Sequence, residues 1–339
     1  MQPFSNFIGI DVSKKTFDAA IIKSTHPTTV IHQCFEQSFD GYNEFINWLA
    51  EHQIAVDDAT LFCLEHTGIY ITGLVDFLVS VKANIWVEMA LRIKRTLGLQ
   101  RGTNDKAAAI NIAQYAYRYE EQVKLWKPIN TSIEQLKHLI AQRDRIVNSI
   151  TQLTVPLNEL EACSNAVYAK QLKKIQYKAI KTLEATLVTI ETTIDSFIQQ
   201  ESTIKNTIKN VTSIKGIGKQ TAVALFVYTN GFTSFENAKQ LACYCGVVPF
   251  NKSSGTSVRS KPGVSQFANH KLKKLLHLCA MAALQWDDEI RAYYLRKVAE
   301  GKNKMSVINA VRNKLLQRIF AVVRDNRTFV KNYQYAVNK

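Results

Sequence analysis

The chain has 339 residues, of which 46% are hydrophobic and 21% charged, a balance typical of a folded globular protein. A chain of this length is too long for a single ordinary hydrophobic core, which predicts about two or three domains. The formal net charge of +15 favours a polyanionic partner, since basic surfaces attract phosphate backbones and anionic membranes alike. No stretch approaches the roughly 20 apolar residues that span a bilayer, and the N-terminus lacks a signal-peptide pattern, so we expect nucleic acid rather than membrane.

The cysteines show no paired spacing of the kind that zinc sites use. Cys243 and Cys245 are one residue apart in an apolar segment, which is too isolated a pair to form such a site. We expect the six to be small buried hydrophobic residues in a reducing compartment: Cys34, Cys63, Cys163, Cys243, Cys245 and Cys279.

Residues 1–125 alternate strand and helix signals and are expected to form the first domain. Amphipathic helical patterns occur around residues 42–49 and 71–78, with apolar residues at spacings of three and four. Three successive strands, followed by alternating helices and strands, give the element order of a ribonuclease-H-like sheet. The predicted strands are Phe7 to Asp11, Phe17 to Ile22, Val30 to Phe35, Thr60 to Glu65 and Asn84 to Val87.

Three acids stand at the ends of predicted elements in this domain. Asp11 and Glu65 each end an apolar strand, where a buried acid is costly unless a cation compensates it. Asp105 opens an Ala-rich helix that runs through Tyr119, and alone it is equally well explained as a helix cap. Together the three acids could hold one or two Mg²⁺ ions for phosphoryl transfer, while Asp11 alone could simply cap a turn.

Residues 126–205 are expected to form a helical segment. Leu183, Leu187, Ile190, Ile194 and Phe197 step by four and three residues, as in a coiled-coil seam. A similar seam begins at Ile133, on the other side of Pro156, so the segment predicts a helical hairpin or two long helices. Packing within one chain and self-association remain equally good explanations of the seam.

Residues 206–339 carry two further motifs. Gly216-Ile217-Gly218-Lys219 before an Ala-rich helix is typical of a helix-hairpin-helix, where glycines and a helix N-terminus approach a phosphate. A helix corner without a ligand is the plainer alternative. The segment from 250 to 274 is basic and without acids, which predicts phosphate contact or a disordered loop: Lys252, Arg259, Lys261, Lys271, Lys273 and Lys274.

Ser253 and Ser254 precede Gly255 in this basic segment, either as turn residues or with one of them as a nucleophile. The last segment, from Gly301, is strongly basic with helically spaced apolar residues from Val307 to Val322. We expect a basic amphipathic helix on phosphates, and removal of the chain after about residue 300 to weaken nucleic-acid binding generally.

Taken in order, these motifs resemble the DEDD transposases of the Piv/MooV type, the recombinases of insertion-sequence family one-ten. The residues that carry the resemblance are Phe7-Ile8-Gly9-Ile10-Asp11-Val12-Ser13-Lys14, Leu64-Glu65-His66-Thr67-Gly68, Asn104-Asp105, the Gly-Ile-Gly hairpin and the stretch from Gly246 to Gly255. The resemblance covers nearly the whole chain. It implies an α/β plus α fold, with a RuvC-like N-terminal domain, a long coiled-coil segment and a mostly helical C-terminal domain with helix-hairpin-helix.

The resemblance also implies an activity and its parts. Asp11, Glu65 and Asp105 would be catalytic and bind Mg²⁺ or Mn²⁺, and Ser254, with Ser253 as the second choice, would attack a DNA phosphate and form a covalent link. Implied partners are double-stranded DNA of element ends and target, a structured non-coding guide RNA, and further copies of the chain as a dimer or tetramer that shares composite sites. The expected location is the bacterial cytoplasm, in association with the nucleoid.

One position departs from this pattern. The fourth acid of the family falls on Ala108, one helical turn after Asp105, so a metal ligand is missing. The chain is then either an engineered inactive form or a natural variant with a weakened site. A binding protein without catalysis, or a RuvC-like junction nuclease in which Ser254 is a turn residue, are the alternative functions.

Overall fold

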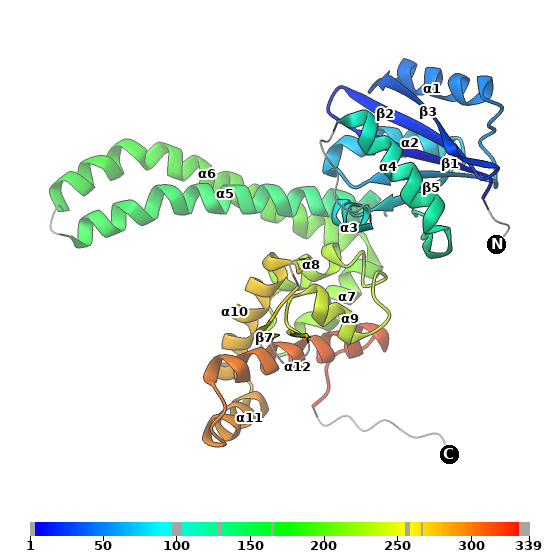
Figure 1. Ribbon diagram of the computed structural model, residues 1–339. Coiled ribbons are helices and arrows are strands. Elements are labelled where there is room, and N and C mark those ends of the chain that lie inside the picture. The colour runs from blue at the N-terminus through cyan, green and yellow to red at the C-terminus, as the bar shows by residue number, and fades with distance from the viewer. Residues whose placement is uncertain are drawn as a thin grey trace. The chain divides into compact units, whose positions relative to one another are not determined.

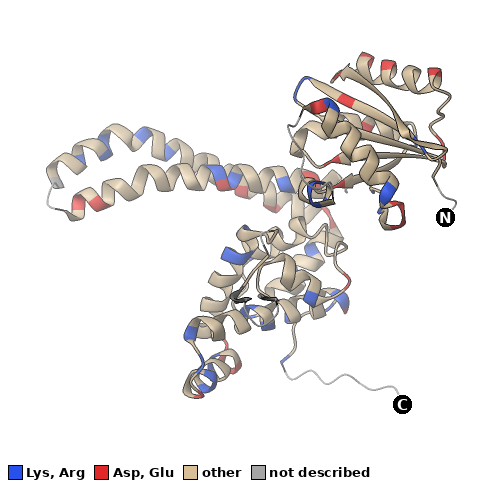
Figure 2. Ribbon diagram, viewed as in Figure 1, with Lys and Arg blue, Asp and Glu red and all other residues tan. Residues whose placement is uncertain are grey.

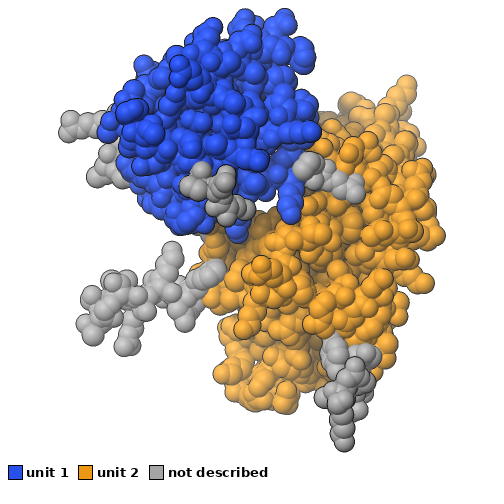
Figure 3. Space-filling model, turned by 90° about the vertical axis from the view of Figure 1, so that its right-hand side faces the viewer, with its two compact units in different colours: residues 1–128 blue, residues 129–339 orange. Residues whose placement is uncertain are grey.

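The chain forms two compact units, residues 1–128 and 129–339, drawn in two colours in Figure 3. A computed structural model describes residues 4–96, 104–127, 131–163, 166–254, 258–265 and 267–331; for residues 250–254 and 258–262 the description is of the backbone. The division of the chain into domains at 125 and 205 stays a prediction. Within the described residues, no helix has the length and apolar character needed to cross a bilayer.

The first unit contains a five-stranded sheet with strand order β3–β2–β1–β4–β5 (Figure 1). β2 pairs antiparallel with both β1 and β3, whereas β4 runs parallel to β1 and β5. The strands are β1 (Asn6–Val12), β2 (Thr16–Lys23), β3 (His26–Glu36), β4 (Thr60–Glu65) and β5 (Asn84–Glu88). All five predicted strands are therefore confirmed.

β3 begins four residues earlier than predicted. Its first residues, which include Pro27, are exposed, and β3 lies at the edge of the sheet. A proline is tolerated on an edge strand because it removes no hydrogen bond from the interior of the sheet. His26 pairs with Lys23, so β2 and β3 join in a tight hairpin.

Helices cover both faces of this sheet. α1 (Phe39–Glu51) and α2 (Thr72–Ser80), the latter following a 3₁₀ turn at Gly68–Ile71, pack with Ile8, Ile10 and Ile21. On the opposite face, α3 (Ala90–Thr96) and α4 (Asp105–Arg118), followed by a 3₁₀ turn at Glu120–Gln122, pack with Phe7 and other strand residues. Burial on both faces explains why the strands are almost continuously apolar.

α4 lies directly on the backbone of β1. A Cβ atom placed on Gly9 would overlap the backbone nitrogen of Ala113 and the carbonyl oxygen of Ala109. Only glycine lets the helix approach the strand so closely. This contact sets the position of the first turn of α4 over the end of β1.

The second unit is mostly helical and includes one hairpin of two strands (Figure 1). Lys and Arg positions are spread over several of its helices (Figure 2). Its elements are α5 (Thr131–Ala162), α6 (Ala166–Gln200), α7 (Ser202–Thr212), α8 (Lys219–Tyr228), α9 (Ala238–Tyr244), β6 (Phe250–Ser254), β7 (Val258–Gly263), α10 (His270–Trp286), α11 (Asp288–Ala299) and α12 (Lys304–Arg324). Together the two units confirm an α/β plus α architecture.

The two long predicted helices are present, but they do not meet at Pro156. Pro156 lies inside α5, and the chain turns after Ala162 instead. α5 and α6 pack side by side, with an ion pair between Arg143 and Glu191. The interior proline removes one backbone hydrogen bond from α5. The packing of α5 against α6 helps to offset this loss, so that the helix continues beyond Pro156.

The apolar positions that the sequence placed on one face of the last helix lie in the interior, where α12 packs. Val311, Leu315 and Ile319 are fully buried and belong to the hydrophobic core of the second unit. The predicted amphipathic helix is therefore confirmed, with its apolar face in this core. The expected loss of nucleic-acid binding on removal of the chain after about residue 300 stays a prediction, and such a truncation would also delete part of the core.

The cysteine expectation is partly correct. Cys63, Cys245 and Cys279 are buried, and burial raises the pKa of the Cys245 thiol to about 12. Cys34 and Cys163 are instead exposed. Cys243 is half-buried.

The close approach at Gly9 gives a direct stability prediction. Gly9→Ala should destabilise the first unit by about 3 kcal/mol, the upper part of the usual range for overpacking, because backbone atoms cannot move aside as a side chain can. Chemical denaturation monitors this change.

Gly263→Ala is the matched control, since a Cβ at Gly263 meets no atom within 4 Å. Equal stability of the two variants would show that α4 does not rest on the β1 backbone.

Candidate functional site

Acidic side chains form a row across four neighbouring strands of the first unit. Asp11 of β1 pairs with Asp18 of β2, and Glu65 of β4 pairs with Glu88 of β5. Directly paired residues point to the same face of a sheet. The strand order places these four acids as Asp18, Asp11, Glu65 and Glu88.

This row faces α4. Gly9 contacts α4, and residues two apart on a strand point to the same face, so Asp11 shares the face of Gly9. The same reasoning applies to Glu65 and Glu88, because Cys63 and Trp86, two residues earlier, pack in the core beneath α4. The end of the sheet and the start of α4 thus present acids to the same region.

Asp105 is the first residue of α4 and joins this region. The side chain of Asn104 caps the helix by accepting a hydrogen bond from the N–H of Ala107 at 2.7 Å. Burial, followed by the charges of Glu65 and Asp105, raises the pKa of Asp11 to about 6, and Lys94 acts in the opposite direction. The three acids chosen from the sequence are therefore electrostatically coupled.

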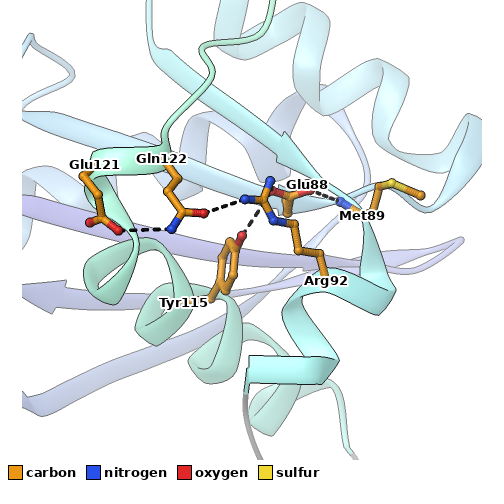
Figure 4. A network of polar contacts seen from close by, with 6 residues as sticks. All are labelled: Glu88, Met89, Arg92, Tyr115, Glu121 and Gln122. Carbon is orange, nitrogen blue, oxygen red and sulfur yellow. Dashed lines mark hydrogen bonds and ion pairs between the residues drawn. The ribbon is translucent and has the colours of Figure 1, made fainter. Parts of the chain in front are cut away.

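The two outer acids of the row have cationic or hydrogen-bonding partners. Asp18 Oδ1 lies 2.6 Å from His32 Nε2 on β3. Figure 4 shows Glu88, which accepts hydrogen bonds from Arg92 at 2.9 Å and from the Tyr115 hydroxyl at 3.1 Å. The Glu88 carboxylate therefore ties β5 to both α3 and α4.

The two inner acids of the row, Asp11 and Glu65, and Asp105 of α4 lack such partners. No hydrogen bond or ion pair joins the side chains of Asp11, Glu65 or Asp105 to another described residue. Their negative charges are left to repel one another, which favours a cation between them. Oxygen ligands of this kind suit Mg²⁺ and Mn²⁺.

The ligand set is nevertheless incomplete. Ala108 lies on α4, one turn after Asp105, and is half-buried at the position of the expected fourth acid. Across the described part of the chain, no three His, Cys, Asp or Glu side chains stand close enough together to bind a metal ion. The donor chemistry fits a divalent cation, whereas the described side chains are not gathered closely enough to surround one.

Asp18 and Glu88 were not identified from the sequence. Each acid lies in or directly after an apolar strand, Phe17 to Ile22 and Asn84 to Val87, which is the signal that drew attention to Asp11 and Glu65. What the sequence lacked was the strand register, which alone shows that these acids stand beside the chosen ones.

The predicted serine motif lies in the second unit. Ser253 and Ser254 end β6 and pair with Arg259 and Val258 of β7. The backbone of both serines is thus part of a hairpin, while Gly255 lies outside the described residues. The side chains of the predicted basic residues Lys252, Arg259 and Lys261 are likewise outside the description.

The predicted Gly-Ile-Gly turn connects α7 and α8. Gly216 has a positive φ of 91°, and a Cβ there would lie 2.7 Å from the backbone nitrogen of Ala283 on α10. Gly216 therefore serves close helix packing. Gly218 forms the N-cap of α8 and has open space around it, while Lys219 is paired with Asp195.

The three predicted lysines of α10 differ in their surroundings. Lys271 forms an ion pair with Asp144 and lies 5.2 Å from the centre of the Tyr228 ring. Lys273 is half-buried and Lys274 is exposed. Phosphate contact at these positions stays a prediction, with Lys274 the most accessible of the three.

Comparison with known proteins gives consistent matches along the chain. A family model for DEDD transposases of the IS110 type matches residues 8–160, and one described as the Transposase IS116/IS110/IS902 family matches residues 208–295. The pilin gene-inverting proteins of Moraxella lacunata and Moraxella bovis are 28% identical over 330 residues, which cover 96% of this chain and 98% of each relative. The 43.6 kDa protein of insertion element IS110 from Streptomyces coelicolor is 36% identical over 115 residues, 34% of this chain and 28% of that protein.

The matches and the paired acids define the class of the protein as a DNA transposase or recombinase. The two family models together cover well over half of the residues. The chain belongs to the IS110 family of DEDD transposases.

The raised pKa of Asp11 predicts a pH-dependent stability. A carboxyl that holds its proton more tightly when folded favours folding at low pH, and this contribution is lost as the pH rises through about 6. Asp11→Asn should therefore melt above the parent at pH 7 in the presence of EDTA, and the two melting temperatures should converge near pH 4.

Asp58→Asn, which removes an exposed acid, controls for the loss of one negative charge. A stabilisation by Asp11→Asn that stays constant between pH 4 and pH 7 would contradict the proposed crowding of carboxylates. The change is expected in this interval because the ordinary pKa of an aspartate, 3.8, lies near its lower end and the raised value of about 6 lies within it.

Proposed function

We propose that this protein is an RNA-guided DNA recombinase that cuts and rejoins DNA through a covalent serine–DNA intermediate. Asp11, Glu65 and Asp105 form its metal-binding acids, and Ser254 is its nucleophile. The observation that carries the proposal is the placement of Asp11 and Glu65 at the ends of adjacent strands, on the sheet face that α4 covers, with Asp105 as the first residue of α4. Membership of the transposase family supports DNA as the substrate.

The sheet supports a RuvC-like assignment of the first unit. Three antiparallel strands are followed by two parallel ones, and the first strand lies at the centre with its acid at the end. α4 then crosses this central strand and brings Asp105 over it. This arrangement agrees with the fold that the sequence motifs imply.

Asp11, Glu65 and Asp105 would hold the divalent metal. Such an ion stabilises the charge on the attacking and leaving oxygens of a phosphoryl transfer. Lys94 adds a positive charge near Asp11, and the Glu88–Arg92–Tyr115 contacts hold α3 and α4 against the sheet. The chain's own residues thus position the acids and limit their movement.

Ser254 supplies the covalent step. Its hydroxyl oxygen attacks a DNA phosphorus and loses its proton, a serine–phosphate bond forms, and the bond to one deoxyribose oxygen breaks. That oxygen leaves as a hydroxyl after it gains a proton, and attack by a second DNA hydroxyl reverses the step. Ser253, the neighbouring residue in the same strand, is the alternative nucleophile.

The remaining partners follow from the family resemblance. A structured non-coding RNA would pair with target and donor DNA, so that base pairing rather than protein contact selects the sequence. Acids of one copy and the serine of another would form composite sites in a dimer or tetramer. The basic composition of the chain, with a net charge of +15, is consistent with two nucleic-acid partners.

Ala108 favours a second function for this chain. With three acids instead of four, metal binding is weakened, and the protein could bind DNA and RNA without catalysis. This loss is either natural or engineered, and an acid at position 108 would distinguish a disabled recombinase from a binding protein.

Ala108→Asp should restore metal affinity. The new carboxylate would stand one turn from Asp105 on α4 and complete the donor set. We expect Mg²⁺ or Mn²⁺ to raise the melting temperature of Ala108→Asp by several degrees more than that of the parent, with half-saturation at lower metal concentration.

Ala108→Asn is the matched control, because it adds similar volume without charge. An equal response of the Asp and Asn variants to metal would place position 108 outside any metal site.

The formation of a covalent protein–DNA link is tested with the Ala108→Asp variant. Ala108→Asp is incubated with element-end DNA, guide RNA and Mg²⁺, and protein–DNA adducts that survive denaturation are measured by gel electrophoresis. We expect adducts from this variant, none from the parent, and none after Ser254→Ala is added.

Three other outcomes each have a definite meaning. Adducts that persist after Ser254→Ala but disappear after Ser253→Ala would move the nucleophile by one residue. Free nicked DNA without adducts would indicate a RuvC-like junction nuclease. Tight nucleic-acid binding without nicks or adducts would support the binding protein.

A further inference from the structure

Arg312 of α12 is a buried cation without an anionic partner. Its exposed fraction is 6%, in the hydrophobic core of the second unit. Every Asp and Glu of the chain lies among the described residues, and none of them forms an ion pair with Arg312. A buried arginine normally has a carboxylate beside it, so this side chain calls for an explanation.

The contacts of Arg312 are neutral and incomplete. Nη2 lies 2.8 Å from Nδ1 of His277 on α10, and Nη1 donates a long hydrogen bond of 3.4 Å to Oδ1 of Asn309. Nε is buried and has no partner among the described residues. Because a guanidinium only donates, His277 must accept through Nδ1 and carry its proton on Nε2.

Arg318, six residues later on the same helix, is an arginine whose positive charge is compensated by carboxylates. It forms hydrogen-bonded ion pairs of 2.7 Å with both Asp287 and Glu289. Arg312 has no such pair, and burial lowers its pKa. An uncompensated buried charge costs free energy, which a ligand anion would recover.

Hydrogen bonds connect Arg312 to the segment before the β6–β7 hairpin, which contains Ser253 and Ser254. Asn309, which accepts from Arg312, donates through Nδ2 to the carbonyl oxygen of Val247 at 2.6 Å. Val247 lies three residues before β6, the strand that ends at Ser254. A chain of hydrogen bonds therefore connects the unpaired guanidinium to the segment that leads into the proposed nucleophile.

We propose that Arg312 binds a phosphate of the DNA strand held at the β6–β7 hairpin. The planar guanidinium presents paired donors that match two phosphate oxygens, and His277 and Asn309 orient it. A phosphate that reaches the guanidinium would supply the anionic partner that the chain itself does not provide. The assignment of DNA rests on the proposed function, since the hairpin carries the residue that would attack DNA.

The test compares Arg312→Met with Arg318→Met in the full chain as it stands, with Ala108. Melting temperature is measured without nucleic acid, and affinity for a DNA duplex of mixed sequence is measured over a range of salt concentrations. Arg312→Met should keep or raise the melting temperature, bind DNA about tenfold more weakly, and show a salt slope less steep by about 0.9, the value for one phosphate contact.

Arg318→Met should show the opposite pattern. It leaves two carboxylates unpaired, so the melting temperature should fall while the salt slope stays unchanged. Arg312→Lys keeps the charge without the fork, and should keep the salt slope with part of the affinity. If Arg312→Met does not fold, the affinity and salt slope of Arg312→Lys are compared with those of the parent instead.

An unchanged salt slope in Arg312→Met, or a lower melting temperature with an unchanged slope, would overturn the proposal and assign Arg312 a structural role. Weaker binding of a structured RNA with unchanged DNA binding would overturn the choice of DNA. The result is independent of the adduct experiment: a changed slope without adducts would retain the phosphate site and reject the recombinase chemistry. Adducts together with an unchanged salt slope would support the recombinase chemistry and reject the phosphate site at Arg312.

Discussion

The contact between α4 and the backbone of β1 at Gly9 determines how the first unit is built. The helix rests on the strand itself rather than on side chains, with Ala109 and Ala113 at the point of approach. Asp105 is one turn before Ala109, and Asp11 is two residues beyond Gly9, so the same contact brings both acids to one end of the sheet. Small residues along the helix and one glycine in the strand therefore determine the packing and, with it, the positions of both acids in the proposed site.

The acids around this contact fall into two groups with different electrostatic roles. Asp18 and Glu88, at the outside of the row, are held by His32 and by Arg92 and Tyr115. Asp11 and Glu65, at the inside, have no such partners among the described residues. The flanking acids thus have partners that hold them, while the central ones are left with a mutual repulsion that the proposed divalent cation would relieve.

Local sequence patterns were sufficient to predict the five strands, the helices between them and the acids at their ends. Apolar periodicity and acids at strand ends can be read from residues that are neighbours in the sequence, so their prediction does not require knowledge of the tertiary structure. Asp18 and Glu88 were missed because their role depends on register, which joins residues on different strands. The pairing of Lys219 with Asp195 and the burial of α12 likewise depend on which helices meet in the second unit.

Pro156 illustrates a different limit. A proline usually marks a helix end, and only the packing of α5 against α6 shows that it does not do so here. The consequence is mechanical. α6 has 35 residues, a length of roughly 50 Å at the rise of an α-helix, and Ile194 and Ile198 at its C-terminal end are embedded in the core. α6 is therefore one uninterrupted rigid element, long in comparison with the core that holds only its C-terminal end.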